Sequence, residues 1–195
     1  MARRDKKRKS QAGRLRIVAG NWRSRLLDVA DVEGLRPTSE RVRETLFNWL
    51  SPRIHGARCL DLFAGTGALG IEALSRGAAG AVFVDRSPVA VRQLNDNVKL
   101  LEAHGATVVR SDALDFLAQE AGGTFDIVFL DPPFAAGLLG ESCRLLAERQ
   151  LLATGALVYL ELDRADVEPD LPDSWQVIKN KTAGKVRYML VEATA

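Results

Sequence analysis

An acidic turn that contains two prolines and an aromatic residue is the part of this sequence best suited to chemistry. Asp131, Pro132, Pro133 and Phe134 follow the apolar run Phe125–Leu130, which predicts a buried strand that ends on a rigid loop. Prolines lack a backbone N–H, so the Asp131 carboxylate and the neighbouring carbonyl oxygens are left as acceptors. Such a turn could hold an amino group on a flat ring, although an ordinary strand-ending loop would have the same composition.

A glycine-rich segment is the second candidate. Residues 61–70 read Asp-Leu-Phe-Ala-Gly-Thr-Gly-Ala-Leu-Gly and follow a predicted strand. With Asp85 twenty positions after Gly65, the Gly-x-Gly-x-x-Gly spacing is typical of a dinucleotide site, and Asp85 could bind the ribose of any adenosine cofactor. Three features favour S-adenosylmethionine: Asp61 inside the motif, Asp112 after the third predicted strand, and the turn at 131–134. The cationic sulfonium and ammonium of S-adenosylmethionine would gain from Asp61, whereas an anionic pyrophosphate would not.

Positive charge is concentrated at the start of the chain. Residues 1–53 carry 14 Lys or Arg against 6 Asp or Glu, whereas residues 54–195 carry 13 against 19. Residues 1–12 are basic and almost free of apolar side chains, which predicts a disordered tail. Cations continue beyond this tail, which favours a nucleic-acid partner over a tail that only improves solubility.

Length and composition limit the class of protein. A chain of 195 residues with 47% hydrophobic and 27% charged residues is typical of one compact domain. No apolar run approaches the roughly 20 residues that span a bilayer, and no secretory signal follows the basic start, so we expect a cytoplasmic protein without a membrane segment. Cys59 and Cys143 are 84 positions apart, which indicates buried reduced thiols and no metal site.

Alternating strands and helices follow from residue 57. Strands are predicted at 58–63, 81–85, 107–110, 124–130 and 156–162, and helices at 68–76, 88–102, 113–119 and 138–148. This alternation indicates an α/β fold with a parallel sheet covered on both faces. Segments 175–181 and 186–192 are separated by only four residues, which predicts an antiparallel hairpin at the end of the chain.

Two elements precede the alternating region. Apolar and basic residues alternate over 14–19, and Gly20-Asn21 separates them from 22–27, which predicts a small hairpin with a basic rim inside an extension over residues 13–35. Thr38 or Ser39 could cap a following helix. Its predicted buried face is Val42, Thr45, Leu46, Trp49 and Leu50, whereas Arg36, Arg41 and Arg43 are expected to point elsewhere, into a site or into solvent.

At these residues the chain resembles the class I methyltransferases, and more narrowly the RsmD family, which methylates the N2 amino group of a guanine in small-subunit ribosomal RNA. The resemblance covers nearly the whole chain after the tail. It rests on Arg16–Arg23 (RIVAGNWR), Gly34–Thr38 (GLRPT), Arg41–Leu50 (RVRETLFNWL), Phe63–Gly70 (FAGTGALG), Glu72–Gly77 (EALSRG) and Asp131–Phe134 (DPPF).

Membership would imply a Rossmann-like, seven-stranded, mostly parallel sheet with an antiparallel C-terminal hairpin, a methyltransferase domain over residues 36–195, and action as a monomer. The implied substrate is the guanine that the family numbers 966 in 16S ribosomal RNA, within a 30S subunit or assembly intermediate. Asp85 and Asp112 stand where Glu and Asn also occur in the family, and both aspartates keep hydrogen-bond acceptors for the cofactor.

We therefore expect three groups of site residues and no metal ligands. The catalytic group is Asp131, Pro132, Pro133 and Phe134. The S-adenosylmethionine-binding group is Thr38, Asp61, Ala64, Gly65, Gly67, Asp85, Arg86, Asp112, Ala113 and Asp131. The nucleic-acid-binding group is Arg14, Arg16, Trp22, Arg23, Arg25 and Arg36.

In the expected mechanism, Asp131 and the Pro132 carbonyl accept the two amino hydrogens and aim the nitrogen at the methyl group, while Phe134 stacks on the extruded base. Removing residues 1–25 should then weaken RNA methylation and spare cofactor binding. Two other functions stay open: a DNA adenine-N6 methyltransferase, whose enzymes use a similar turn, and a non-catalytic RNA-binding assembly factor.

Overall fold

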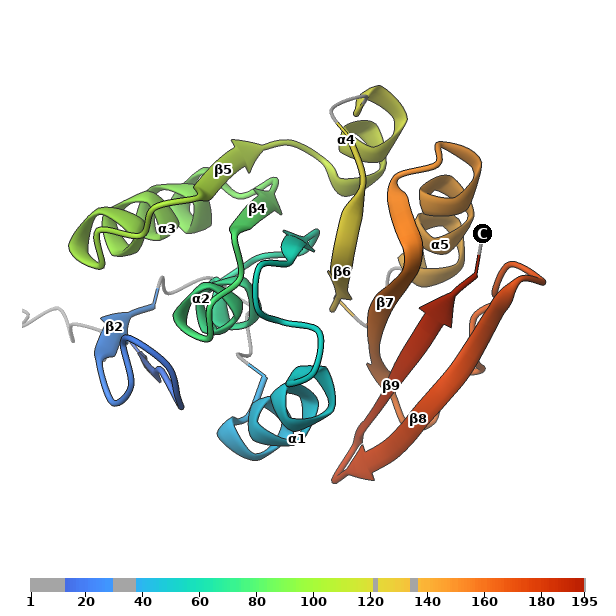
Figure 1. Cartoon of the computed structure of the whole chain (residues 1–195), viewed down its shortest axis with the longest axis horizontal. Helices are drawn as coiled ribbons and strands as arrows, with labels where there is room; N and C mark the ends of the chain where they lie inside the picture. Colours follow the sequence, from blue (N-terminus) through green and yellow to red (C-terminus); the bar gives the residue numbers. More distant parts are fainter. Residues whose placement is uncertain (1–12, 30–37, 121–122, 134–136, 195) are drawn as a thin grey trace, which may run out of the picture.

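A seven-stranded sheet forms the centre of the computed structural model, which describes residues 13–29, 38–120, 123–133 and 137–194. The strands are β3 (Arg58–Asp61), β4 (Gly80–Asp85), β5 (Ala106–Arg110), β6 (Phe125–Leu130), β7 (Leu152–Asp163), β8 (Trp175–Ala183) and β9 (Val186–Ala193). Their order is β5-β4-β3-β6-β7-β9-β8 (Figure 1). Strands β3 to β7 pair in parallel, and β9 is antiparallel to both of its neighbours. The predicted α/β class and C-terminal hairpin are confirmed.

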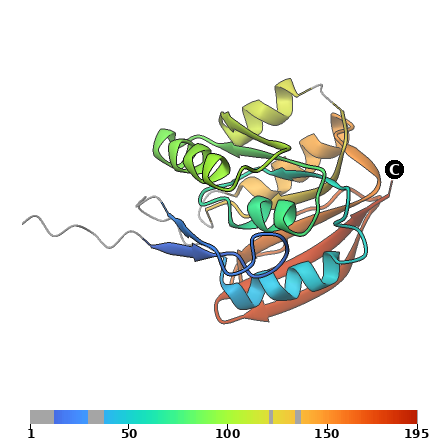
Figure 2. The same cartoon turned by 60° about the vertical axis from the view of Figure 1, so that its left-hand side comes forward.

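Helices cover both faces of the sheet. They are α1 (Glu40–Leu50), α2 (Ala68–Ser75), α3 (Pro88–Leu100), α4 (Ala113–Gln119) and α5 (Leu138–Glu148). Buried residues of α1, α2 and α3 share one core with one face of the sheet, and those of α4 and α5 share a second core with the other face. Helices α4 and α5 lie side by side in both views (Figures 1 and 2).

The predicted N-terminal hairpin is confirmed, with shorter strands. β1 (Arg14–Arg16) and β2 (Leu26–Asp28) are antiparallel, and the turn is closed by the Ser24 N–H, which donates to the Ile17 carbonyl over 2.8 Å. Leu15, Ile17 and Leu27 are buried in the same core as α1. The hairpin therefore packs as part of this core. The predicted tail at 1–12 and residues 30–35 of the extension lie outside the described residues.

Helix α1 begins at a serine cap. The Ser39 hydroxyl accepts from the Val42 N–H over 3.3 Å, so Ser39 and not Thr38 caps the helix, and the Thr38 side chain is available for another contact. Trp49 belongs to the core as expected, since its ring stacks on Tyr188 with centroids 5.4 Å apart.

The cysteines, the lengths of the helices and the possible metal ligands are three further features for which the sequence makes predictions. Cys59 and Cys143 are buried free thiols, and burial raises the pKa of each to about 12. Among the described residues, none of the helices is long and apolar enough to cross a membrane. The same part of the chain has no group of three or more His, Cys, Asp or Glu side chains placed to hold a metal ion.

Candidate active site

Acidic side chains follow one another along the carboxyl edge of the sheet. In the spatial order of their strands they are Asp112 after β5, Asp85 on β4, Asp61 on β3, Asp131 after β6 and Glu161 on β7. Carboxyl ends of parallel strands meet at one edge of a sheet, where ligands of open α/β folds bind. The sequence therefore predicted four members of this acidic edge and missed Glu161.

The glycine-rich turn is held against the acidic edge. Gly65 and Gly67 have φ angles of +50° and +76°, and Gly67 immediately precedes α2. The Gly65 N–H donates to Asp85 Oδ2 over 2.8 Å, and Asp85 Oδ1 accepts from the Ser87 N–H over 2.7 Å. The turn and the end of β4 are thus joined, and each Asp85 oxygen keeps a second lone pair for a ligand.

Glycine is also required where α2 crosses the sheet. A Cβ atom on Gly70 would lie 2.3 Å from the Phe83 ring of β4, so no larger residue fits without displacement. The third glycine of a dinucleotide-type turn serves the same close packing of helix on strand. The packing of Gly70 against Phe83 is therefore typical of a turn that binds a nucleotide cofactor.

Asp61 is buried behind this turn. Its carboxyl is 3% exposed and accepts from the Gly70 N–H over 2.9 Å. Burial, with a smaller contribution from the charge of Asp85, raises the pKa of Asp61 to about 7. A carboxyl with that pKa ionises readily when a positive charge approaches, so the site suits a cationic ligand.

The other predicted cofactor residues lie at the same edge. Asp112 Oδ1 caps α4 by accepting from the Leu114 N–H over 2.9 Å. Ala64 and Ala113 are buried, and Arg86 is exposed directly after β4. Ala64 and Ala113 could contact a ligand through their backbone, whereas Arg86 presents a charged side chain to solvent.

Asp131 and Glu161 form a pair of neighbouring carboxyls. Leu130 of β6 pairs with Leu160 of β7, which places the two acids side by side. Thr38 Oγ1 donates to Asp131 Oδ2 over 3.2 Å, and the Tyr159 hydroxyl donates to Glu161 Oε2 over 2.7 Å. Burial raises the pKa of both carboxyls, and the charge of Glu161 raises that of Asp131 further. Each carboxyl of the pair therefore binds a proton more readily than an exposed carboxyl does.

A cavity adjoins this pair. It has a volume of about 400 Å³ and is lined by Pro132, Pro133, Glu161, the start of α5 and the segment 166–170. Pro132 is buried and Pro133 is exposed, whereas Phe134 lies outside the described residues. Cavities of a few hundred Å³ accommodate small ligands, so a nucleobase could enter beside the acidic turn.

The prediction for the Arg43 side chain was wrong. This side chain was expected to point into a site or solvent, but it is 2% exposed. Its Nη1 lies 3.3 Å from Glu72 Oε2, Nη2 donates to the Arg16 carbonyl over 2.9 Å, and Nε donates to the Thr38 carbonyl over 3.3 Å. Five guanidinium donors can bind several acceptors at once, which is why an arginine can occupy this interior position.

Glu72 completes the buried network. Its two oxygens accept from the Val18 and Ala19 N–H groups, each over 2.9 Å, and from Arg76 Nε over 2.9 Å. The Arg43–Glu72 pair therefore joins the N-terminal hairpin to α1 and α2. Through Thr38, the same network reaches Asp131.

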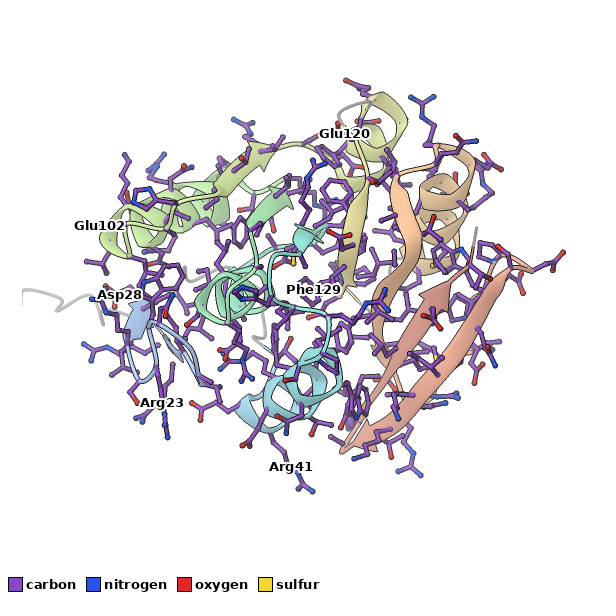
Figure 3. All side chains as sticks on the ribbon, in the orientation of Figure 1. Arg23, Asp28, Arg41, Glu102, Glu120 and Phe129 are labelled. Carbon is purple, nitrogen blue, oxygen red and sulfur yellow. The ribbon has the colours of Figure 1, made fainter. Side chains whose placement is uncertain are left out.

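The hairpin presents its cations to solvent. Arg14 and Arg16 form exposed ion pairs with Asp28 at 4.0 Å and Glu40 at 3.9 Å. Arg23 and Arg25 are exposed, and Figure 3 shows Arg23 on the outer side of the hairpin. Trp22 is partly buried against the core, and Arg36 lies outside the described residues.

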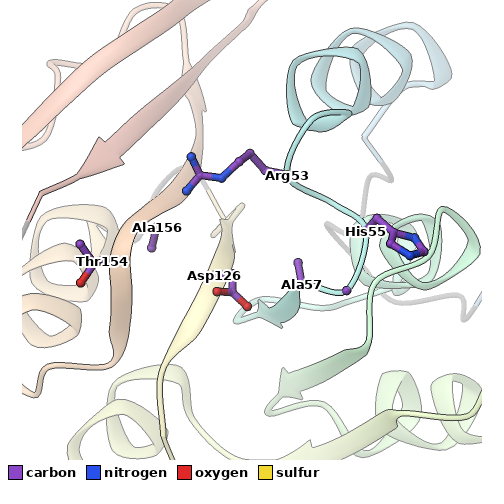
Figure 4. A pocket seen from close by; sticks show the side chains of 7 residues that line it. Arg53, His55, Ala57, Asp126, Thr154 and Ala156 are labelled. Carbon is purple, nitrogen blue, oxygen red and sulfur yellow. The ribbon is translucent and has the colours of Figure 1, made fainter.

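A smaller cavity lies at the opposite edge of the sheet (Figure 4). It measures about 150 Å³ and is lined by residues that include Arg53, His55 and Asp126. Arg53 Nη2 donates to the Gly155 carbonyl over 2.7 Å, and Asp126 Oδ2 accepts from the Arg58 N–H over 2.8 Å. These charged groups serve internal contacts, and the cavity is remote from the acidic edge.

The turn after β3, the acid that ends β4 and the Asp-Pro-Pro turn after β6 define a class I, Rossmann-like methyltransferase fold. A family model described as Conserved hypothetical protein 95 matches residues 15–192. The chain belongs to this family, the RsmD family.

Named relatives match along almost their whole length. Ribosomal RNA small subunit methyltransferase D of Escherichia coli K12 is 50% identical over 186 residues, which cover 95% of this chain and 93% of that protein. The protein of the same name from Haemophilus influenzae is 45% identical over 183 residues, covering 92% and 94%.

Solved structures agree on the fold. The Escherichia coli protein yhhF has a TM-score of 0.87 at 47% identity and covers 93% of this chain and 99% of its own. The Thermus thermophilus 16S rRNA N2 G1207 methyltransferase RsmC, in complex with AdoMet and guanosine, has a TM-score of 0.68 at 22% identity and covers 94% and 50%. At that identity the second likeness shows a common fold alone.

Proposed function

We propose that the protein transfers a methyl group from S-adenosylmethionine to the exocyclic N2 of a guanine, position 966, in 16S ribosomal RNA. It acts in the cytoplasm, as a monomer, on a 30S subunit or an assembly intermediate. The observation that carries this proposal is the position of Asp131, between the acidic cofactor edge and the cavity beside Pro132. The names of the relatives, which are ribosomal RNA small subunit methyltransferases, support the RNA substrate.

The acidic edge fits the proposed cofactor. S-adenosylmethionine supplies an electrophilic methyl group on a cationic sulfonium. Asp61 is placed to favour that positive charge, Asp85 can accept from the ribose hydroxyls, and the glycine turn lets the backbone approach the ligand closely. Asp112 lies beyond β4 along the same edge, where the adenine would extend.

The Asp131 turn would prepare the nucleophile. A guanine N2 lone pair is delocalised into the ring, so the amino group must be held and polarised. Asp131 and the Pro132 carbonyl accept its two hydrogens, which aligns the nitrogen and stabilises the positive charge that develops on it. As the N–C bond forms, the bond between the methyl group and the sulfonium sulfur would break and leave a neutral thioether. One N–H proton then leaves, and the Asp131–Glu161 pair can receive it because burial raises the pKa of both carboxyls.

A transfer assay with labelled S-adenosylmethionine tests the proposal. The acceptors are immature 30S particles, free ribosomal RNA and duplex DNA, and the labelled nucleoside is identified after digestion. Label on guanine N2 in the particles is the expected result. Label in DNA adenine would favour the adenine enzyme, and binding to RNA without transfer would favour the assembly factor.

The affinity for S-adenosylmethionine is expected to increase with pH. Asp61 has a pKa of about 7 in the free protein, and a bound cation favours its ionised form, so binding at lower pH must first remove a proton. Between pH about 5.5 and pH about 7 we expect Kd to fall about tenfold, with proton release visible by calorimetry in buffers of different ionisation enthalpy.

The Asp61→Asn variant is the control for this pH dependence. It should bind S-adenosylmethionine more weakly at neutral pH and show a shallower pH profile. A profile identical in slope to that of the unmodified protein would remove Asp61 from the explanation.

A further inference from the structure

The C-terminal hairpin is a basic island in an acidic part of the chain. Residues 175–191 contain Lys179, Lys181, Lys185 and Arg187 but no Asp or Glu, whereas residues 54–195 as a whole carry 13 Lys or Arg against 19 Asp or Glu. A cluster of positive charge within a segment of negative net charge is typical of a surface that binds an anionic partner.

The lysines of β8 lie in line with the active site. Leu130, Leu160, Met189 and Asn180 are register partners across β6, β7, β9 and β8, so Lys181 stands in the next row, with Asp131 and Glu161. With strands about 4.8 Å apart, the backbone of β8 is about 14 Å from that of β6. A strand of RNA whose base reached Asp131 would have neighbouring phosphates at this range.

Both strand lysines point to the face that carries α1. Lys179 is opposite Leu190 and Lys181 is opposite Tyr188, and these two partners belong to the α1 core. The Lys181 Nζ lies 5.8 Å from the centroid of the Trp49 ring. In Figure 1, α1 stands between the N-terminal hairpin and β8–β9, so cations flank this helix from both sides.

Three lysines of this hairpin are exposed to solvent. Lys179 and Lys181 on β8 and Lys185 at the tip are all exposed. Arg187, by contrast, contacts Glu168 and donates to Asn180 Oδ1 over 3.3 Å. The charge offered to a partner therefore comes from the lysines, which bind phosphate as point charges.

We propose that Lys179, Lys181 and Lys185 form a second RNA-binding surface, which contacts phosphates flanking the target nucleotide. This inference rests on the proposed RNA substrate and adds a surface separate from the N-terminal hairpin. The two cationic surfaces hold the RNA on either side of α1, and the acidic edge between them receives the base and the cofactor.

Edge-strand lysines also prevent edge-to-edge association, and a charge reversal separates the two roles. Glutamate protects an edge as a charged residue but repels phosphate. The test variant is Lys179→Glu with Lys181→Glu in the full-length protein. Its matched control is Lys99→Glu with Arg149→Glu, which changes the net charge equally. These two residues lie at the C-terminal ends of α3 and α5, on the side of the sheet away from the acidic edge.

Steady-state kinetics with 30S particles are measured over a series of salt concentrations. For the β8 variant we expect KM for particles to rise about tenfold, while kcat and the Kd for S-adenosylmethionine stay unchanged. The slope of log KM against log salt concentration should fall by about two, which corresponds to the loss of two phosphate contacts. The α3–α5 control should retain at least most of the unmodified affinity.

Equal KM values for the two double variants would overturn the second RNA surface. So would a β8 variant that stays monomeric on size-exclusion chromatography and keeps the unmodified KM, since glutamate would then have replaced the lysines in edge protection, their only role. If the unmodified protein methylates no RNA at all, the proposed function fails first, and the two failures are thus distinguished.

Discussion

Asp131→Asn is expected to slow methyl transfer by a factor of about 10²–10³ while the Kd for S-adenosylmethionine changes little. An amide keeps the size of the side chain, but its NH₂ group cannot accept a hydrogen from the substrate amino group and carries no negative charge to offset the charge developing on nitrogen. Loss of one preorganised electrostatic contact has this order of effect on rate.

Single-turnover transfer to 30S particles measures this effect, and calorimetry measures cofactor affinity in parallel. Asp96→Asn, an exposed change of the same chemistry on α3, is the matched control and should transfer at the unmodified rate. An Asp131→Asn variant with unmodified single-turnover kinetics would show that the Pro132 carbonyl alone suffices. A loss confined to cofactor affinity would show that Asp131 binds the cofactor and does not act on the substrate amino group.

Glu72→Gln is expected to lower the free energy of unfolding by about 3–5 kcal/mol. The change leaves the Arg43 guanidinium buried without its counter-charge, and removing one partner of a buried ion pair has effects of this size. Glutamine also replaces one of the two carboxylate oxygens by an NH₂ donor, so one of the Val18 and Ala19 N–H groups loses its acceptor.

Urea unfolding followed by fluorescence measures this loss. The control is Glu141→Gln, which removes one partner of an exposed pair with Arg144 on α5 and should change stability by less than about 1 kcal/mol. A double variant, Arg43→Met with Glu72→Leu, should recover much of the stability because no buried charge remains. Equal losses for Glu72→Gln and Glu141→Gln would contradict the assignment of the buried network.

The same network changes the interpretation of an N-terminal deletion. From sequence, removing residues 1–25 was predicted to weaken RNA methylation alone. The structure shows that the deleted part supplies the buried Leu15 and Ile17 and two donors to Glu72, so the deletion is expected to destabilise the methyltransferase domain as well. Arg23→Glu with Arg25→Glu isolates the charge contribution, because both side chains are exposed.

Local signals predicted most of the elements, and long-range contacts explain what they missed. The bounds of α4 and α5 agree with prediction because Asp112 and Gly137 mark the residues before each helix. Arg43 shares its face with Leu46 and Leu50 at helical spacing, yet its charge argued for solvent. Its partner Glu72 lies 29 positions away, beyond any local pattern.

Glu161 was missed for a related reason. It interrupts the apolar run of β7, and a carboxyl inside a buried strand was the available signal. What makes it part of the site is its neighbour on β6, and parallel pairing across a crossover cannot be read from either strand alone.

The contact of the N-terminal hairpin with Glu72 has a consequence for folding during synthesis. Val18 and Ala19 leave the ribosome 54 and 53 residues before the carboxylate that accepts their N–H groups. At about 5–20 residues per second, α2 follows the hairpin after about 3–11 s. The first segment to be made therefore waits for its binding partner, and its cations acquire their final arrangement only once the cofactor half of the domain has been translated.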